Sequence, residues 1–300
     1  MRRVFVVLAL TGIVGVVLTG YGGAAWIKAG QYVTTPPNPV SDRGDTPAAL
    51  GIPFETVAFP TAAGDGLTLR GWWLPGDTRI TNTMHTTRRT VVLVHGRYEN
   101  RAAHLDLAAR LWQQGYAVLL FDLRGHGDSD RAPCTSGLRE AGDVTGAVRF
   151  ALTQQGAAVG HIAVIGWSLG GASALIAMAD TPEITAVVAD SAYANADLLL
   201  AHNPLRPGLT LALRLRYGAD IGAVSPESAV TRIAPRHVLL IHGTNDSAVP
   251  LTQAVRLRDA AGANGTFWPV ADVGHTGAFA HDPDVYLAHL LPFLDAQLGS

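Results

Sequence analysis

The sequence predicts an α/β protein built on a doubly wound, mostly parallel sheet. From about residue 55 onward, short apolar runs of the kind buried in parallel sheets alternate with segments of helical pattern. Polar, glycine-containing loops follow several of these runs. The chain has 300 residues, of which 48% are hydrophobic and 15% are charged, so it has enough apolar material for one sizeable core.

The first expected elements form a hairpin, and the later ones alternate strand with helix. Residues 56–59 and 67–73 are the two hairpin strands, joined by the turn-rich Ala63-Gly64-Asp65-Gly66. Further strands are expected at 90–94, 117–121, 162–165, 184–189, 237–241 and 266–270. Helices are expected at 101–114, 137–155, 168–179, 251–261 and 284–298. This alternation favours parallel neighbouring strands connected by crossover helices.

An apolar leader precedes the folded part and predicts a membrane-directed segment at residues 1–30. The run from Val4 to Ile27 is uncharged and follows Arg2 and Arg3. As a helix its 24 residues span about 36 Å, enough for a hydrocarbon core of about 30 Å. We expect a signal anchor that holds the domain on the extracytoplasmic side of the membrane. The alternative is a signal peptide cleaved near Gly22-Gly23-Ala24-Ala25, which would release a secreted protein.

The rest of the chain divides into a linker and one domain. Residues 31–52 are expected to form the linker, because Pro36-Pro37-Asn38-Pro39 is typical of a stiff polar spacer. Residues 53–300 form the expected domain. Within it, residues 191–236 lack a clear strand and predict a small helical lid, because connections this long are usually functional. The alternative is an ordinary crossover helix with a long loop.

Charge and cysteine content exclude several classes of protein. The formal net charge is −2, and no block of basic residues is long enough to suggest a nucleic-acid groove. Cys134 is the only cysteine, which excludes an internal disulfide and a cysteine-rich metal site. The sequence implies neither a metal nor an organic cofactor, and it does not predict an oligomeric state.

A G-x-S-x-G pentapeptide supplies the candidate nucleophile, Ser168. It reads Gly166-Trp167-Ser168-Leu169-Gly170 and lies between an expected strand and an expected helix. A turn this tight projects the serine hydroxyl, and the glycines let the two backbones approach closely. Alone the pentapeptide is a weak signal, but a strand leading in and a helix leading out strengthen it.

A serine hydroxyl needs a base, and that base needs a carboxylate to orient it. We expect His275 to be the base and Asp246 the acid, since each follows a buried run. The carboxyl ends of parallel strands meet at one edge of a sheet, where active sites lie. Asp190 is the first rival for the acid and Asp272 the second. Asp246 has the alternative of merely capping a helix, and His275 of being a loop histidine bonded to backbone.

The oxyanion formed during acyl transfer needs two hydrogen-bond donors. The N–H of Leu169 is expected to be one, and the N–H of Arg97 the other, with that of Tyr98 as the alternative to Arg97. The Arg97 guanidinium has the alternatives of binding an anionic substrate or lying in solvent. We expect Tyr98 and Trp167 to contact the substrate.

The loop from Asp122 to Ser129 is expected to form a tight, hydrogen-bonded turn, with a structural role for Asp122. His95 and His242 precede glycines at strand ends. We expect these two histidines to tie loops together and not to bind a metal.

Together these segments resemble the α/β-hydrolase superfamily over roughly residues 53–298. The resemblance rests on His95-Gly96, residues 122–129, residues 166–171, residues 243–246 and Gly274-His275. Within the superfamily, residues 67–75 look like the opening strand of a membrane-anchored, small-lidded group. That group is similar to serine-aminopeptidase-like and BEM46-like hydrolases. The resemblance implies an eight-stranded, mostly parallel sheet and acyl-enzyme chemistry.

We therefore expect a serine hydrolase that cleaves an acyl ester or thioester of a small-molecule or lipid-like substrate. The alternative reaction is hydrolysis of an amide or peptide, whose leaving amine must be protonated as it departs. A further alternative is a non-catalytic binding protein on a hydrolase fold. The expected partners are the acyl substrate and, through the leader, a membrane.

Overall fold

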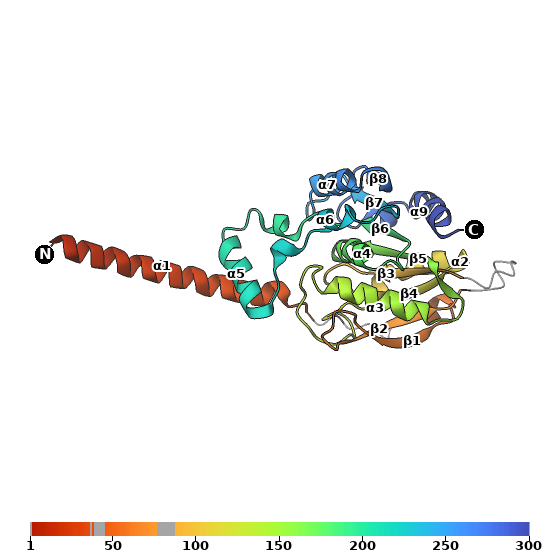
Figure 1. The fold of residues 1–300 in the computed structure, drawn as a ribbon, viewed down its shortest axis with the longest axis horizontal. Coiled ribbons are helices and arrows are strands. Elements are labelled where there is room, and N and C mark those ends of the chain that lie inside the picture. Colours follow the sequence, from red (N-terminus) through yellow and green to blue (C-terminus); the bar gives the residue numbers. More distant parts are fainter. Residues whose placement is uncertain (1, 37, 39–45, 77–87, 300) are drawn as a thin grey trace.

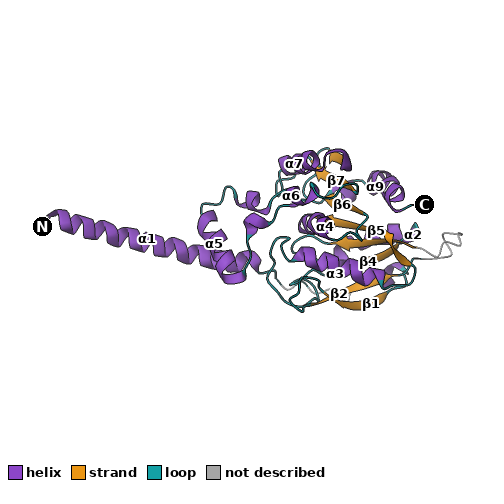
Figure 2. Cartoon of the chain, viewed as in Figure 1, coloured by secondary structure: helices purple, strands orange, loops and turns teal. Residues whose placement is uncertain are grey.

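The computed structural model describes residues 2–36, 38, 46–76 and 88–299; the side chains of residues 2–17 and 88 lie outside the description. Part of the predicted linker, including Pro37 and Pro39, also lies outside it. Figure 1 shows a central sheet between two layers of helices, with one long helix extending away from this body. Figure 2 shows that the strands lie in the middle of the layers, as expected for a doubly wound fold.

The sheet has eight strands in the order β1-β2-β4-β3-β5-β6-β7-β8. Their bounds are β1 Glu55–Pro60, β2 Thr68–Leu74, β3 Arg88–Val94, β4 Ala117–Phe121, β5 Ala157–Trp167, β6 Ala186–Asp190, β7 His237–Gly243 and β8 Gly265–Val270. The pairs β1–β2 and β2–β4 are antiparallel, and the other five are parallel. The predicted hairpin and the mostly parallel eight-stranded sheet are confirmed.

Helices cover both faces of the sheet because the strand side chains alternate between them. Val92 and Val94 of β3 point to one apolar layer, and Val91 and Leu93 point to the other. The first layer contains α3 Glu140–Leu152, α4 Leu169–Asp180, α6 Pro226–Val230 and α7 Leu251–Ala261. The second contains α2 Leu105–Gln113, α8 Ala278–His281 and α9 Pro283–Leu298. Short 3-10 helices lie at Pro47–Leu50, Arg101–His104 and Gly262–Asn264.

The predicted lid segment, residues 191–236, connects β6 to β7 and is mainly helical. It contains the 3-10 helices Ala196–Leu200 and Ile221–Ala223 and the helices α5 Arg206–Tyr217 and α6. The end of α1, Arg2–Val33, packs against α5 (Figure 1). Ala29 and Val33 share an apolar cluster with Leu209 and Leu213.

The predicted membrane span, residues 4–27, falls largely on residues 2–17, whose side chains are outside the described part. Among the described residues, none belongs to a helix that is long and apolar enough to cross a membrane.

Candidate active site

Ser168 stands at a sharp turn between the end of β5 and the start of α4. Its backbone has a φ of 49°, which an L-residue adopts only at a cost of about 1–3 kcal/mol. The flanking glycines make the turn possible. A Cβ at Gly166 would lie 2.4 Å from the carbonyl carbon of Gly170, and one at Gly170 would lie 2.1 Å from the carbonyl oxygen of Val94. The turn therefore requires glycine at both positions.

The structure brings Ser168, His275 and Asp246 into one hydrogen-bonded line. His275 Nε2 lies 2.9 Å from the hydroxyl oxygen of Ser168. His275 Nδ1 lies 2.7 Å from Oδ2 of Asp246. The three residues come from loops at the carboxyl ends of β5, β7 and β8. This arrangement lets the imidazole accept a proton from the serine while the carboxylate holds the other ring nitrogen.

Asp246 is held as a carboxylate. Its side chain is buried, and its Oδ1 accepts hydrogen bonds from the N–H groups of Ala248 and Val249 at 2.9 and 2.8 Å. Burial raises the pKa of Asp246, but the hydrogen bonds from His275 and Val249 outweigh it and leave that pKa below its usual value. Asp246 therefore stays ionised at neutral pH and can orient His275.

The rival acids do not bond to His275 within the described structure. Asp190 is buried and accepts a hydrogen bond from the hydroxyl of Ser191 at 2.9 Å. The same hydroxyl oxygen accepts the N–H of Thr276 at 3.0 Å, so Asp190 is connected to the histidine loop only indirectly. Burial raises the pKa of Asp190 to about 7. Asp272 is exposed.

The loop after β3 lies against the serine turn and presents two free amides. The N–H of Gly96 is occupied, because it donates to a carboxylate oxygen of Glu99 at 2.7 Å. The N–H groups of Arg97, Tyr98 and Leu169 have no acceptor within the described residues, so the alternative donor, Tyr98, is as free as Arg97. Gly170 packs directly on the carbonyls of Val94 and His95, which brings the loop close to the first turn of α4. The free amides include both that the sequence predicts as oxyanion donors, those of Leu169 and Arg97, and also the alternative, that of Tyr98.

The side chains expected to contact substrate differ in their placement. Tyr98 is 55% exposed and therefore available. Trp167 is only 1% exposed and stacks on His104, with ring centroids 3.4 Å apart. The expectation for Trp167 needs correction, because the alternation along β5 directs this side chain into the α2–α9 layer. The Arg97 guanidinium is turned toward Cys134 and Ser136.

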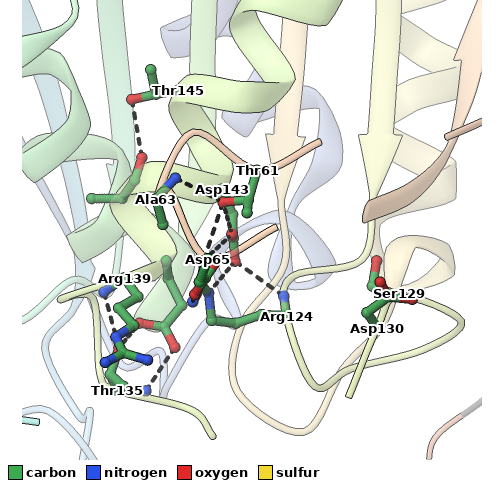
Figure 3. Close-up of polar contacts among 12 residues, drawn as sticks. Thr61, Ala63, Asp65, Arg124, Ser129, Asp130, Thr135, Arg139, Asp143 and Thr145 are labelled. Atoms are coloured by element: carbon green, nitrogen blue, oxygen red, sulfur yellow. Dashed lines mark hydrogen bonds and ion pairs between the residues drawn. The ribbon is translucent and has the colours of Figure 1, made fainter. Parts of the chain in front are cut away.

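The Asp122–Ser129 loop is fixed by buried ion pairs. Asp122 accepts hydrogen bonds from the N–H and the guanidinium of Arg101. Figure 3 shows the second pair, in which Arg124 donates to Asp143 at 2.6 and 2.9 Å and to Asp65 at 2.6 Å. Sequence analysis predicted a structural loop but missed Arg124 and Asp143, since no local pattern links the two.

The two glycine-flanking histidines connect loops. His95 Nε2 accepts the N–H of Leu123 at 3.0 Å, and burial lowers the pKa of His95 to about 4, so the ring is neutral. His242 Nε2 lies 2.8 Å from the carbonyl oxygen of Val249 and donates to it. In the described part of the chain, no group of three or more histidine, cysteine or acidic side chains is placed to hold a metal ion.

The fold is that of the α/β hydrolases. The chain is similar to the α/β hydrolase GrgF from Penicillium, with a TM-score of 0.68, 21% identity, and coverage of 83% of this chain and 100% of that one. It is also similar to the esterase Pf2001 from Pyrococcus furiosus, with a TM-score of 0.71, 24% identity, and coverage of 89% and 99%.

Sequence comparison finds a matching family model and a relative. Residues 85–232 match the family model of the serine aminopeptidases S33, a range that contains Ser168 but not Asp246 or His275. The chain is 28% identical over 250 residues to the uncharacterized protein YfhR of Escherichia coli K12, covering 82% of this chain and 83% of YfhR.

Proposed function

We propose that the protein is a serine hydrolase that cleaves an acyl ester or thioester through an acyl-enzyme intermediate. The observation that carries this proposal is the line Ser168–His275–Asp246, with contacts of 2.9 and 2.7 Å. The strained serine backbone supports it, because strain of this kind concentrates at functional sites. The solved esterase with the same fold favours an ester as the substrate.

The proposed reaction begins when the Ser168 oxygen attacks the acyl carbonyl and His275 Nε2 takes the serine proton. Asp246 stabilises the resulting imidazolium through Nδ1. The N–H groups of Leu169 and Arg97 bind the oxyanion. His275 then passes the proton to the departing alcohol or thiol. A water molecule, deprotonated by His275, attacks the acyl-enzyme and releases the acid.

Covalent labelling tests this proposal. A fluorophosphonate probe should attach to Ser168 of the wild-type protein, as located by peptide mass spectrometry. Ser168→Ala should fold, as judged by circular dichroism, and remain unlabelled. A well-folded wild-type protein that is not labelled, or one labelled at another residue, would overturn the proposal.

A series of p-nitrophenyl esters from acetate to palmitate would define the acyl group. We propose a lipid-like substrate, supported by exposed apolar side chains on the lid, such as Leu211 and Leu215 at 57% and 70% exposure. This predicts that kcat/KM rises with chain length. A steep preference for acetate would refute the lipid-like substrate and leave the hydrolase intact.

The second candidate reaction is amide or peptide hydrolysis, which the match to the serine aminopeptidase model favours. Matched p-nitrophenyl ester and p-nitroanilide substrates with one acyl group separate the two. Turnover of the anilide at a rate comparable to that of the ester would support the peptidase, and turnover of the ester alone would support the esterase.

We also propose that residues 4–27 anchor the protein in a membrane, with the domain on the extracytoplasmic side. The uncharged run after Arg2 and Arg3 supports this, and Trp26 and Ile27 are exposed. The full chain should then stay with the membrane fraction after a carbonate wash. Its release by that wash would contradict the anchor.

A further inference from the structure

The end of α1 reaches the loop that presents the proposed oxyanion donor. The Arg97 guanidinium lies over the ring of Tyr32, with its central carbon 4.7 Å from the ring centroid. One guanidinium nitrogen donates to Cys134 Sγ at 3.0 Å and to Ser136 Oγ at 3.1 Å. The Tyr32 hydroxyl lies 3.0 Å from the same serine oxygen. The Arg97 side chain is therefore held from two sides, by α1 and by the segment before α3.

The segment before α3, which carries Cys134 and Ser136, is itself held in place. The N–H of Cys134 donates to the carbonyl of Val33 at 2.9 Å, and the Tyr193 hydroxyl donates to the carbonyl of Ser136 at 2.9 Å. No carboxylate forms an ion pair with Arg97 among the described residues. The guanidinium is thus held by neutral groups and an aromatic face, which position it without drawing it into a charge pair.

A second contact holds the next residue of the loop. The side-chain amide of Asn38 donates to the carbonyl of Tyr98 at 2.9 Å, and Asn100 donates to the carbonyl of Asn38 at 3.2 Å. Tyr98 has a φ of 70°, an unfavourable conformation for a bulky residue that persists only where the surroundings impose it. The loop is therefore held in a strained shape at the residue beside Arg97.

We propose that Tyr32, Asn38, Arg97, Cys134 and Ser136 form a clamp that positions the Arg97 N–H for oxyanion binding. The Arg97 side chain acts through its own backbone: pinning the guanidinium fixes where the amide points. Arg97, Tyr32 and Asn38 are positioning residues in this sense. Through Tyr32 and Asn38, the N-terminal segment contributes to the geometry of the active site. The proposal rests on the proposed hydrolase function.

The main test is the steady-state kinetics of Arg97→Ala on the best p-nitrophenyl ester. Removing an oxyanion donor outright costs about 10²–10³-fold in kcat, so misplacing it should cost about 10–100-fold with little change in KM. The pH dependence of kcat/KM should keep its acid limb, because His275 and Asp246 are untouched. The kcat of Arg97→Lys, which retains the charge but not the planar fork, should lie between that of the wild type and that of Arg97→Ala.

Graded variants of Tyr32 probe the same clamp from α1. Tyr32→Phe loses the hydroxyl contact to Ser136 but keeps the ring under the guanidinium, so kcat should fall less than about threefold. Tyr32→Ala loses both contacts and should approach the effect of Arg97→Ala. Arg97→Met retains the aliphatic stem and serves if Arg97→Ala fails to fold.

Arg236→Ala is the matched control. Arg236 is also partly buried, and its guanidinium donates to the carbonyls of Thr181, Ile184 and Ile233 at 2.9, 3.0 and 3.4 Å. It precedes β7, however, at the amino ends of the parallel strands and away from the serine turn. Its loss should lower the melting temperature and leave kcat per labelled active site within about twofold, an energy difference of about 0.4 kcal/mol.

The outcomes separate the two proposals. If wild-type protein is labelled at Ser168 and Arg97→Ala turns over at the wild-type rate, the clamp is refuted and the hydrolase stands. If Arg97→Ala raises KM with kcat unchanged, the guanidinium binds substrate and the clamp is again refuted. If the wild-type protein is neither labelled nor active, the hydrolase itself fails.

Discussion

Replacing Asp246 by asparagine should remove most of the activity while keeping the fold. Oδ1 of Asp246 accepts the N–H groups of Ala248 and Val249, and a side-chain amide oxygen can do the same. Its NH2 group then takes the place of Oδ2, 2.7 Å from His275 Nδ1. This group only donates hydrogen bonds, so Nδ1 must give up its proton and act as the acceptor. The proton moves to Nε2, which can no longer accept one from Ser168.

The expected loss follows from this wrong tautomer. A carboxylate-to-amide change at the same place in another serine hydrolase triad costs about 10⁴-fold in kcat, or about 5.4 kcal/mol of transition-state stabilisation. KM should change little, because Asp246 is buried behind His275 and does not reach the substrate. The melting temperature should stay close to that of the wild type.

The assay is the steady-state hydrolysis of one p-nitrophenyl ester at pH 7–8, with Asp190→Asn as the matched control. Asp190 is equally buried and lies near the same histidine loop, but its oxygen contacts Ser191. We expect Asp190→Asn to retain kcat within about tenfold, equivalent to about 1.4 kcal/mol. The reasoning is refuted if Asp246→Asn stays within tenfold of the wild type while Asp190→Asn loses a thousandfold.

Three further predictions concern stability. Gly170→Ala places a methyl group 2.1 Å from the carbonyl oxygen of Val94, so it should cost at least about 1–3 kcal/mol and lower the melting temperature; an unchanged melting temperature would show that the turn can relax. Asp143→Ala leaves the buried Arg124 without its main partner and should cost about 3–5 kcal/mol in urea unfolding, and a loss below 1 kcal/mol would contradict it. Because the pKa of Asp190 is raised to about 7, the native state holds a proton that the unfolded state has lost above its ordinary pKa. The free energy of unfolding of the wild type should therefore fall, relative to that of Asp190→Asn, by up to about 4 kcal/mol as the pH rises from 4 to 7. Urea unfolding across that range measures the difference, and a difference that does not change with pH would contradict the raised pKa of Asp190.

Much of the fold and the central site could be predicted from the sequence because the signals are local. The periodic spacing of apolar residues along the chain indicates strands and helices. Ser168, His275 and Asp246 each follow a strand, and in a parallel sheet such positions converge without any knowledge of side-chain contacts. This is why three loops far apart in the chain could be brought together from sequence alone.

The remaining details depend on contacts between distant segments, which have no periodic signature. Arg97 was predicted as an amide donor, but its side-chain partners lie in α1 and before α3. The burial of Trp167 was accessible in principle, because Ile165 of the same strand faces the same layer and the two are separated by the period of a strand. The prediction of substrate contact relied on the position of Trp167 next to Ser168 in the motif and not on the face of the sheet to which its side chain points.

Because Ser168 has a positive φ, the stability of the fold and catalytic activity favour different residues at this position. Glycine would occupy this backbone conformation at no steric cost, so Ser168→Gly should yield a protein that is more stable but catalytically inactive. Under selection for heat resistance alone, the residue at 168 would drift toward glycine. A hydroxyl is retained there only as long as the organism gains more from the reaction than from a longer-lived fold.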